Sequence, residues 1–463
     1  MKWIVIIFVT LFARVIFALD ANSIYDSDTN HLWNRLNETL FERTAQDGKK
    51  YGLDELDILY WARTTNLLAG VSHQQALSVL DEFINSHGEK SIRDPLKRAL
   101  LQRDLWELFD WSTGYTSSPN EKLARRELQS RLAIAIRRLA LTTNEIAALP
   151  DNYARTTKIS APDLPAGLNQ TNGDWLSVSD QNDLLTTPTH VAFFRGHSTF
   201  QVLVRFPEGR QAAIAYLDQL RRFEHIWIYQ TNPMFPFTIT YGFDGTNSVP
   251  IATNNEPREI LTLNPGLPQF PTNTEWALVR RMCVIDADGN IQPSPMMESV
   301  QMRHYYGFGD PTIEMETNMN GFVVPVSIPP IHFYEFQMNR RQNCELRELG
   351  LHEKDFNFVH FMGMGFDQFE YTSRNASNEV EILDSAKLRS VTLNTCTQCH
   401  SGPGLYSVNS YTRALSFFSE SPQRPANLTP LDFNREIENT IFWKQRQFDW
   451  GLLQGLWSQE NNK

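Results

Sequence analysis

Two of the four cysteines lie three positions apart and are followed directly by a histidine, in the stretch TLNTCTQCHSGPG at residues 392–404. Cys396, Cys399 and His400 form the C-x-x-C-H pattern, which is typical of covalent haem attachment. Two thiols on one short helical turn add across the two vinyl groups of haem, and the next imidazole then lies under the iron as its proximal ligand. The spacing therefore predicts one covalent haem c, with Cys396 and Cys399 as thioether residues and His400 as iron ligand.

Other uses of these cysteines compete with haem attachment. Cys396 and Cys399 could form a redox-active disulfide, since VTLNT before them is compatible with a strand. A zinc site that also drew on Cys283 and Cys344 would need separations far outside those of structural zinc sites. Two structural disulfides are compatible with export, and Cys283 and Cys344 either pair or remain buried free cysteines. Haem is favoured because chance produces this pentapeptide about once in a thousand such chains.

The segment TCTQCHSGPG resembles the attachment site of c-type cytochromes. The resemblance covers about ten residues and implies that His400 is the proximal ligand. In the small electron carriers of that family the attachment site lies near the start of the domain, and a later methionine supplies the sixth ligand. Here neither Met nor His follows His400. Upstream, LWNRLNETL, DPLKRALLQRDLWELFDW and LVRRMCVIDADGN resemble only uncharacterised bacterial envelope proteins.

The missing downstream ligand has two physical solutions. A side chain from earlier in the chain could cover the distal face, and the nearest candidates are His352, His360, Met362 and Met364. Alternatively, the sixth position is open or holds water, as in haem proteins that bind small ligands. Sulfur ligation suits electron transfer, whereas an open face suits peroxide or diatomic chemistry. Each candidate also has an ordinary interpretation as a packing residue beside aromatic side chains.

The N-terminus, MKWIVIIFVTLFARVIFALDA, predicts export. Lys2 supplies a positive start, an apolar run follows, and Ala18 precedes a possible cleavage point. Residues 1–18 are therefore interpreted as a signal peptide and the mature protein as periplasmic or otherwise extracytoplasmic. The alternative is an uncleaved N-terminal anchor, because Arg14 interrupts the apolar run. No later segment has the length of apolar sequence that a membrane span needs.

The rest of the sequence predicts a multidomain α+β protein. Residues 24–150 form a helical domain, 151–330 a strand-rich α+β domain, and 331–463 a mainly helical, cytochrome c-like haem-binding region. A segment rich in Pro, Gly, Asn and Thr at 149–175 is interpreted as the linker between the first two.

Several elements carry local signals. Asp94 followed by Pro95 is typical of a helix start, and leucines at helical spacing predict another helix over 121–140. Residues 276–286 and 297–305 predict paired strands joined through an Asp-Gly turn. FYEFQMNRRQNCELRELG predicts a helix that ends at Gly350. The turn sequence DADGN lacks the glutamate and glycine of a calcium loop, so a structural role is favoured.

Composition restricts the function classes. A formal net charge of −11 excludes a generally basic nucleic-acid binder, and no pattern typical of hydrolases or nucleotide binders occurs. We expect an exported monohaem c-type cytochrome-like protein that transfers electrons with a redox partner protein of the cell envelope. Two alternatives remain: a peroxidase-like haem enzyme with an open distal site, and a non-enzymatic envelope interaction protein with structural haem or a disulfide. The sequence leaves open whether the protein is an enzyme.

Overall fold

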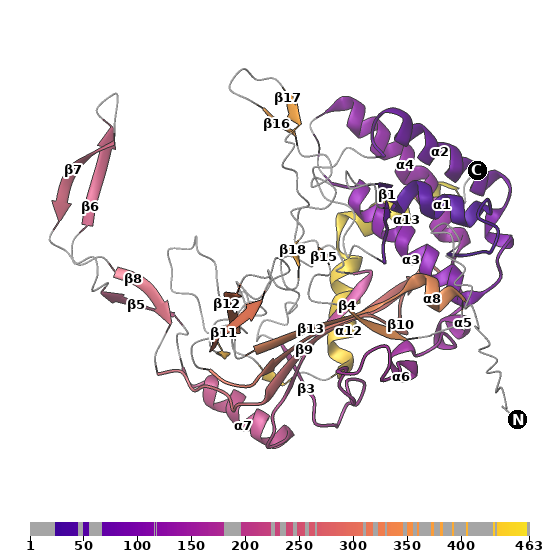
Figure 1. The fold of residues 1–463 in the computed structure, drawn as a ribbon. Coiled ribbons are helices and arrows are strands. Elements are labelled where there is room, and N and C mark those ends of the chain that lie inside the picture. Colours follow the sequence, from indigo (N-terminus) through magenta and orange to yellow (C-terminus); the bar gives the residue numbers. More distant parts are fainter. Residues whose placement is uncertain are drawn as a thin grey trace, which may run out of the picture.

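The structure is a computed structural model of the chain (Figure 1). The residues that it describes are 24–44, 50–54, 67–114, 116, 118–179, 196–223, 227–231, 238–243, 248–254, 259–263, 266–308, 312–317, 323–328, 331–345, 350–354, 359–360, 372–374, 380–382, 391–392, 404–405, 429–430 and 433–460.

A layer of helices forms the N-terminal part. Its members are α1 (Leu32–Phe41), α2 (Gly70–Asn85), α3 (Pro95–Ser112), α4 (Pro119–Arg138), and the short α5 (Thr143–Ala147). Helix α3 begins as predicted, because the Asp94 carboxylate accepts hydrogen bonds from the backbone N–H groups of Leu96 at 2.8 Å and Lys97 at 3.1 Å. The predicted helix over 121–140 is α4, which starts two residues earlier.

Helix α3 lies at the centre of the molecule, between the other helices and a sheet. Residues on every side of it are buried, including the polar Gln102, Arg103, Asp104 and Glu107. It packs against α4 on one side and against strand β9 on the other. A helix buried all round must place its polar side chains opposite partners in neighbouring elements.

The sheet has seven antiparallel strands in the order β14-β13-β10-β9-β4-β3-β19. The predicted hairpin is its centre: Val279 on β9 lies opposite Val300 on β10. In the turn, Asp286 Oδ1 accepts hydrogen bonds from the N–H groups of Asp288 and Asn290, and Gly289 has a φ of +87°. The acidic turn is thus closed by its own hydrogen bonds. The strands are β3 (Leu176–Ser179), β4 (Ser198–Arg205), β9 (Thr274–Ile285), β10 (Ile291–Tyr305), β13 (Ile331–Met338), β14 (Leu351–Lys354) and β19 (Thr429–Pro430).

Shorter elements surround this framework. The helices are α6 (Asn152–Arg155), α7 (Arg210–Leu220) and α8 (Arg340–Glu345), and Gly88–Lys90 form the 3-10 turn η1. Two-stranded ladders pair β1 (Arg43–Thr44) with β2 (Lys50–Tyr51), β5 (Trp227–Thr231) with β8 (Glu259–Leu263), β6 (Thr238–Phe243) with β7 (Ser248–Asn254), β11 (Thr312–Thr317) with β12 (Val323–Ile328), β15 (Val359–His360) with β18 (Val391–Thr392), and β16 (Thr372–Arg374) with β17 (Val380–Ile382).

The chain ends in two helices, α12 (Phe433–Gln445) and α13 (Phe448–Glu460), which return to the N-terminal helices (Figure 1). Helix α12 packs against β4, and α13 packs against α4. Trp457 Nε1 donates to the carbonyl oxygen of Ala133 at 2.8 Å, and the ring of Trp450 lies 5.8 Å from that of Trp106. These are the two helices that the structure describes near the end of the chain, and the mainly helical haem-binding region over 331–463 stays a prediction.

One expectation from the sequence is wrong. The segment FYEFQM is not helical but belongs to strand β13, which pairs with β10 from Ser299↔Gln337 to Tyr305↔Ile331. Aromatic and β-branched residues fit a pleated surface, and the edge of β10 supplies their backbone partners. The segment 149–175 packs against the sheet, where Asn152 exchanges two hydrogen bonds with the backbone of Met297, at 2.8 and 2.7 Å. Its interpretation as a linker between domains stays a prediction.

The described residues therefore form a mixed α+β structure. One hydrophobic core contains Trp33, Val279 and Trp450, which come from the three regions that the sequence suggested. The division into domains at residues 150 and 330 stays a prediction. Within the described ranges, no helix is both long and apolar enough to cross a membrane.

Candidate functional site

The haem-attachment residues Cys396, Cys399 and His400 lie outside the described residues, as do Met362 and Met364. The residues that flank this segment on both sides are described, however. The described part of the candidate site consists of these two flanks and the side chains around them.

The flank before the attachment segment is a strand. Val391 and Thr392 form β18, which pairs antiparallel with β15 in the register Val359↔Thr392 and His360↔Val391. This ladder (Figure 1) brings the backbone of His360 beside the strand that ends four residues before Cys396. Among the sixth-ligand candidates in the described ranges, His352 lies on β14 at the edge of the large sheet. The topology thus places the backbone of His360 next to the segment that leads into the attachment site.

The flank after the segment is fixed to the sheet side of the molecule. The backbone N–H of Leu405 donates to Oε1 of Gln269 at 2.7 Å, and Leu405 is 2% exposed in the hydrophobic core. Gly404 has a φ of +50°, and a Cβ there would overlap the Gln269 side chain. A residue with a side chain at 404 would therefore have a strained backbone and would require the end of the Gln269 side chain to move out of this contact. We call this contact the Gln269 anchor.

An aromatic cluster adjoins the anchor. The residue after Gln269 is Phe270, which is 1% exposed, and its ring lies 5.0 Å from that of Tyr305 and 6.1 Å from that of Trp276. Such rings exclude water and lower the local dielectric constant. We call these residues the Phe270 cluster: Phe206, Tyr216, Phe270, Trp276, Tyr305 and Phe308.

A hollow of about 480 Å³ lies beside the Phe270 cluster, at the ends of β4 and β10. Arg205 and Glu275 form an ion pair in its wall, with Arg205 Nε 2.5 Å from Glu275 Oε2. His304 also lines it, and burial lowers the pKa of this histidine, although Glu275 opposes the effect. The hollow gives the apolar cluster a polar rim that no sequence pattern indicated, because its residues come from separate strands.

A buried ionic network fixes α3 to the sheet. Arg103 is 1% exposed and pairs with Glu107 on its own helix and with Glu298, whose Oε1 lies 2.5 Å from Arg103 Nε. Burial opposes the charge of Arg103, but these carboxylates outweigh it and raise its pKa. Burial likewise raises the pKa of Glu107, with Arg103 opposing. Because these charges are matched by partners inside the protein, we interpret the network as structural.

The described cysteines are neither bridged nor arranged for metal. Cys283 on β9 and Cys344 on α8 are free and buried, so the disulfide considered from the sequence does not form. Burial raises the pKa of both thiols, which makes them poor nucleophiles. In the part of the chain that the structure describes, no three His, Cys, Asp or Glu side chains are grouped to hold a metal ion.

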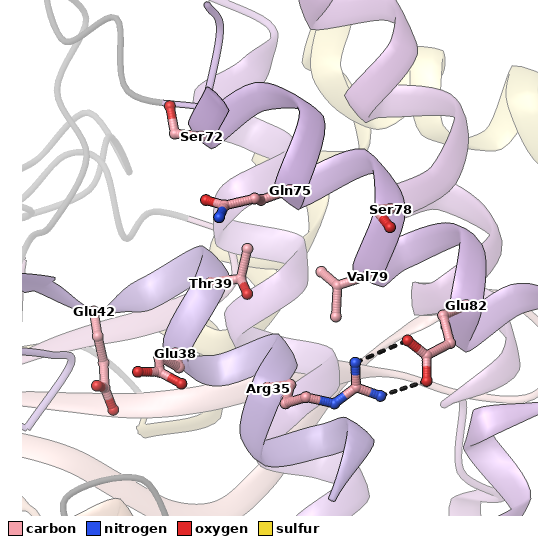
Figure 2. Close-up of a pocket in the computed structure, with 9 residues that line it drawn as sticks. All are labelled: Arg35, Glu38, Thr39, Glu42, Ser72, Gln75, Ser78, Val79 and Glu82. Carbon is pink, nitrogen blue, oxygen red and sulfur yellow. Dashed lines mark hydrogen bonds and ion pairs between the residues drawn. The ribbon is translucent and has the colours of Figure 1, made fainter. Parts of the chain in front are cut away.

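An open polar groove of about 540 Å³ runs between α1 and α2 (Figure 2). Arg35 and Glu82 close one end with two hydrogen bonds, and both side chains are more than a third exposed. An exposed pair of this kind contributes at most about 1 kcal/mol. The groove belongs to the helical layer, and its lining is Arg35, Glu38, Thr39, Glu42, Ser72, Gln75, Ser78, Val79 and Glu82.

Comparison with known proteins gives no match. No protein-family model matches the chain, and neither a curated protein nor a solved structure matches it. Its function must therefore be argued from its own residues and fold.

Proposed function

We propose that the protein is an exported, monohaem c-type cytochrome-like protein that exchanges single electrons with a redox partner of the cell envelope. The observation that carries this proposal is the pentapeptide formed by Cys396, Cys399 and His400. The N-terminal sequence supports export. Export agrees with the attachment pattern, because covalent haem attachment takes place on the export side of the membrane in cells that perform it. An uncleaved N-terminal anchor is the alternative for residues 1–18.

The flanks of the attachment segment support a haem-binding role. Cys396 and Cys399 would hold the porphyrin through thioether bonds, and His400 would supply the proximal nitrogen. When bound, haem supplies one-electron chemistry that the side chains of the protein lack. The anchored Leu405 and the Phe270 cluster would exclude water from one side of the segment. Such surroundings are one of the means by which a protein tunes a haem potential.

For the sixth ligand we propose His360. The β15–β18 ladder supports this choice because it fixes the backbone of His360 beside the strand that precedes Cys396. Met362 and Met364 follow His360 at short range in the sequence and are the next candidates. A variant pair separates the histidines: replacing His360 with alanine should convert the low-spin spectrum to a high-spin one, whereas the matched change His352→Ala should not.

A haem-dependent redox enzyme is the second candidate. One observation favours it: residues 401–463 contain neither Met nor His, the residue types that most often supply a sixth ligand. The absorption spectrum of the reduced protein distinguishes the two functions. A spectrum that is unchanged by carbon monoxide supports electron transfer, and a spectrum that shifts supports an open site.

The proposal is tested by producing the full-length protein in a host that matures c-type cytochromes. Haem staining of a denaturing gel should label the chain, because thioether bonds survive denaturation. The matched control is the Cys396→Ala/Cys399→Ala variant, which should be expressed and remain unstained. An unstained wild-type chain of normal yield would refute the proposal.

A further inference from the structure

A buried lysine joins the C-terminal helices to the centre of the molecule. Lys444 on α12 is 1% exposed, and its Nζ donates to Oδ2 of Asp110 on α3 at 2.6 Å. The same nitrogen donates to Oδ2 of Asp449, in the first turn of α13, at 2.7 Å. It also lies 5.7 Å from the centre of the Trp106 ring. One ammonium group therefore connects three helices.

The charges around this lysine are unequal. Asp110 also faces His197, the residue directly before β4, whose Nε2 lies 3.7 Å from Asp110 Oδ2. Glu107 lies one turn before Asp110 on α3. Among the described residues at this junction, two carboxylates share the ammonium of Lys444, and Glu107 adds negative potential. When both carboxylates are ionised, an excess negative charge is held where little water can solvate it.

We propose that Asp110, Lys444 and Asp449 form a proton-controlled clamp that holds the helix pair α12–α13 against α3, tight when Asp110 carries a proton and looser when it is ionised. The residues of the clamp lie outside the haem segment. The inference therefore goes beyond the proposed function and does not depend on it.

The titration of Asp110 supports this device. Burial raises the pKa of Asp110 to about 7; Lys444 opposes the shift, and Asp449 and Glu107 add to it. In an opened state the carboxyl regains an ordinary pKa near 4. The closed state thus binds the proton more tightly. The stabilisation of the closed state over the opened state by this proton is complete below about pH 4 and is lost as the pH rises toward 7.

The size of the effect follows from this difference. Between about pH 4 and 7 the opening constant rises about tenfold per pH unit, and above about pH 8 it levels off. Between pH 5 and 7 the increase is about fifty-fold, since half of the closed molecules have lost the proton at pH 7.

The test is hydrogen–deuterium exchange of the mature protein, followed by mass spectrometry of peptides from α12 and α13. After correction for the intrinsic exchange rate, wild-type protection should fall about fifty-fold from pH 5 to pH 7 and then level off. The Asp110→Asn variant keeps an oxygen that accepts from Lys444 but cannot titrate, so it should lack the fifty-fold fall in protection between pH 5 and pH 7. The matched control Asp81→Asn removes a carboxylate that pairs with Arg131 at the surface, and it should keep the wild-type slope.

Two results would overturn the clamp. One is wild-type protection of α12 and α13 that does not change between pH 5 and 7, a result that requires no variant. The other is an Asp110→Asn slope equal to that of wild type. If Asp110→Asn does not fold, Asp449→Asn provides the second variant. Removing this carboxylate should lower the pKa of Asp110 and move the plateau to lower pH, and an unmoved plateau would contradict the proposal.

Discussion

Replacing Arg340 with methionine tests how charges are held in the core. Nε and Nη2 of Arg340 donate to the two carboxylate oxygens of Asp104, each at 2.9 Å, and the backbone N–H of Arg340 donates to Asp54 Oδ1 at 2.8 Å. Asp104 is fully buried. Methionine fills much of the same volume but leaves the Asp104 carboxylate buried without its guanidinium. Removing one partner of a buried ion pair costs about 3–5 kcal/mol of unfolding free energy.

The expected loss is measured by urea denaturation, with far-ultraviolet circular dichroism and tryptophan fluorescence as independent probes. The matched control is Arg35→Met, because Arg35 also donates two hydrogen bonds to one carboxylate, that of Glu82, but at the surface. We expect a cost of at most about 1 kcal/mol there. The double variant Arg340→Met/Asp104→Leu should recover much of the loss, since it removes the fully buried carboxylate together with its guanidinium. If Arg340→Met costs no more than Arg35→Met, burial is not what makes the pair important.

Three further predictions concern other parts of the fold. Gln102→Leu should destabilise the protein by about 2–4 kcal/mol in the same denaturation assay, because the backbone N–H and carbonyl of Ile285 lose the side chain that bonds to both; a loss below about 0.5 kcal/mol would contradict this. Cys283 and Cys344 should resist alkylation in the folded protein and both react after unfolding without reductant; a disulfide that links the peptides of these two cysteines would contradict this. Gly404→Ala should lower the yield of haem-loaded protein, measured by absorbance, because the new methyl group overlaps the anchoring side chain; an unchanged yield would show that the anchor does not position the segment.

Local signals in the sequence predicted local structure well. The side chain of Asp94 and the ring of Pro95 act within the first turn of α3, so the start of that helix can be read from a few adjacent residues. The hairpin β9–β10 is likewise marked by the Asp-Gly turn that joins its two strands. The helix predicted to begin at Phe333 was wrong because a neighbouring strand decides the structure of this segment: β10 supplies the backbone partners that make it a strand.

The buried charges could not be predicted for a related reason. Arg103 and Glu107 are spaced like an exposed ion pair on a helix, but both are buried and Arg103 also pairs with Glu298, which is distant in sequence. Lys444 and Asp110 are more than 300 positions apart, so no local pattern connects them.

The candidate site also has one part that local sequence reveals and one part that depends on distant contacts. The attachment pattern is readable because its chemistry depends on residues within a single turn. The Gln269 anchor and the ladder that carries His360 depend on contacts across the fold, and neither has a local signal. The sequence therefore indicates which cofactor to expect, and the structure adds where the flanks of its binding segment lie.

The mass of the intact mature protein tests the central claim most directly. Covalent haem at Cys396 and Cys399 predicts a chain that is heavier than the processed polypeptide by about 616 Da, with the added mass on the peptide that contains both cysteines. The Cys396→Ala/Cys399→Ala variant should lack this addition. Wild-type protein from a haem-maturing host that has the mass of the polypeptide alone would contradict the account.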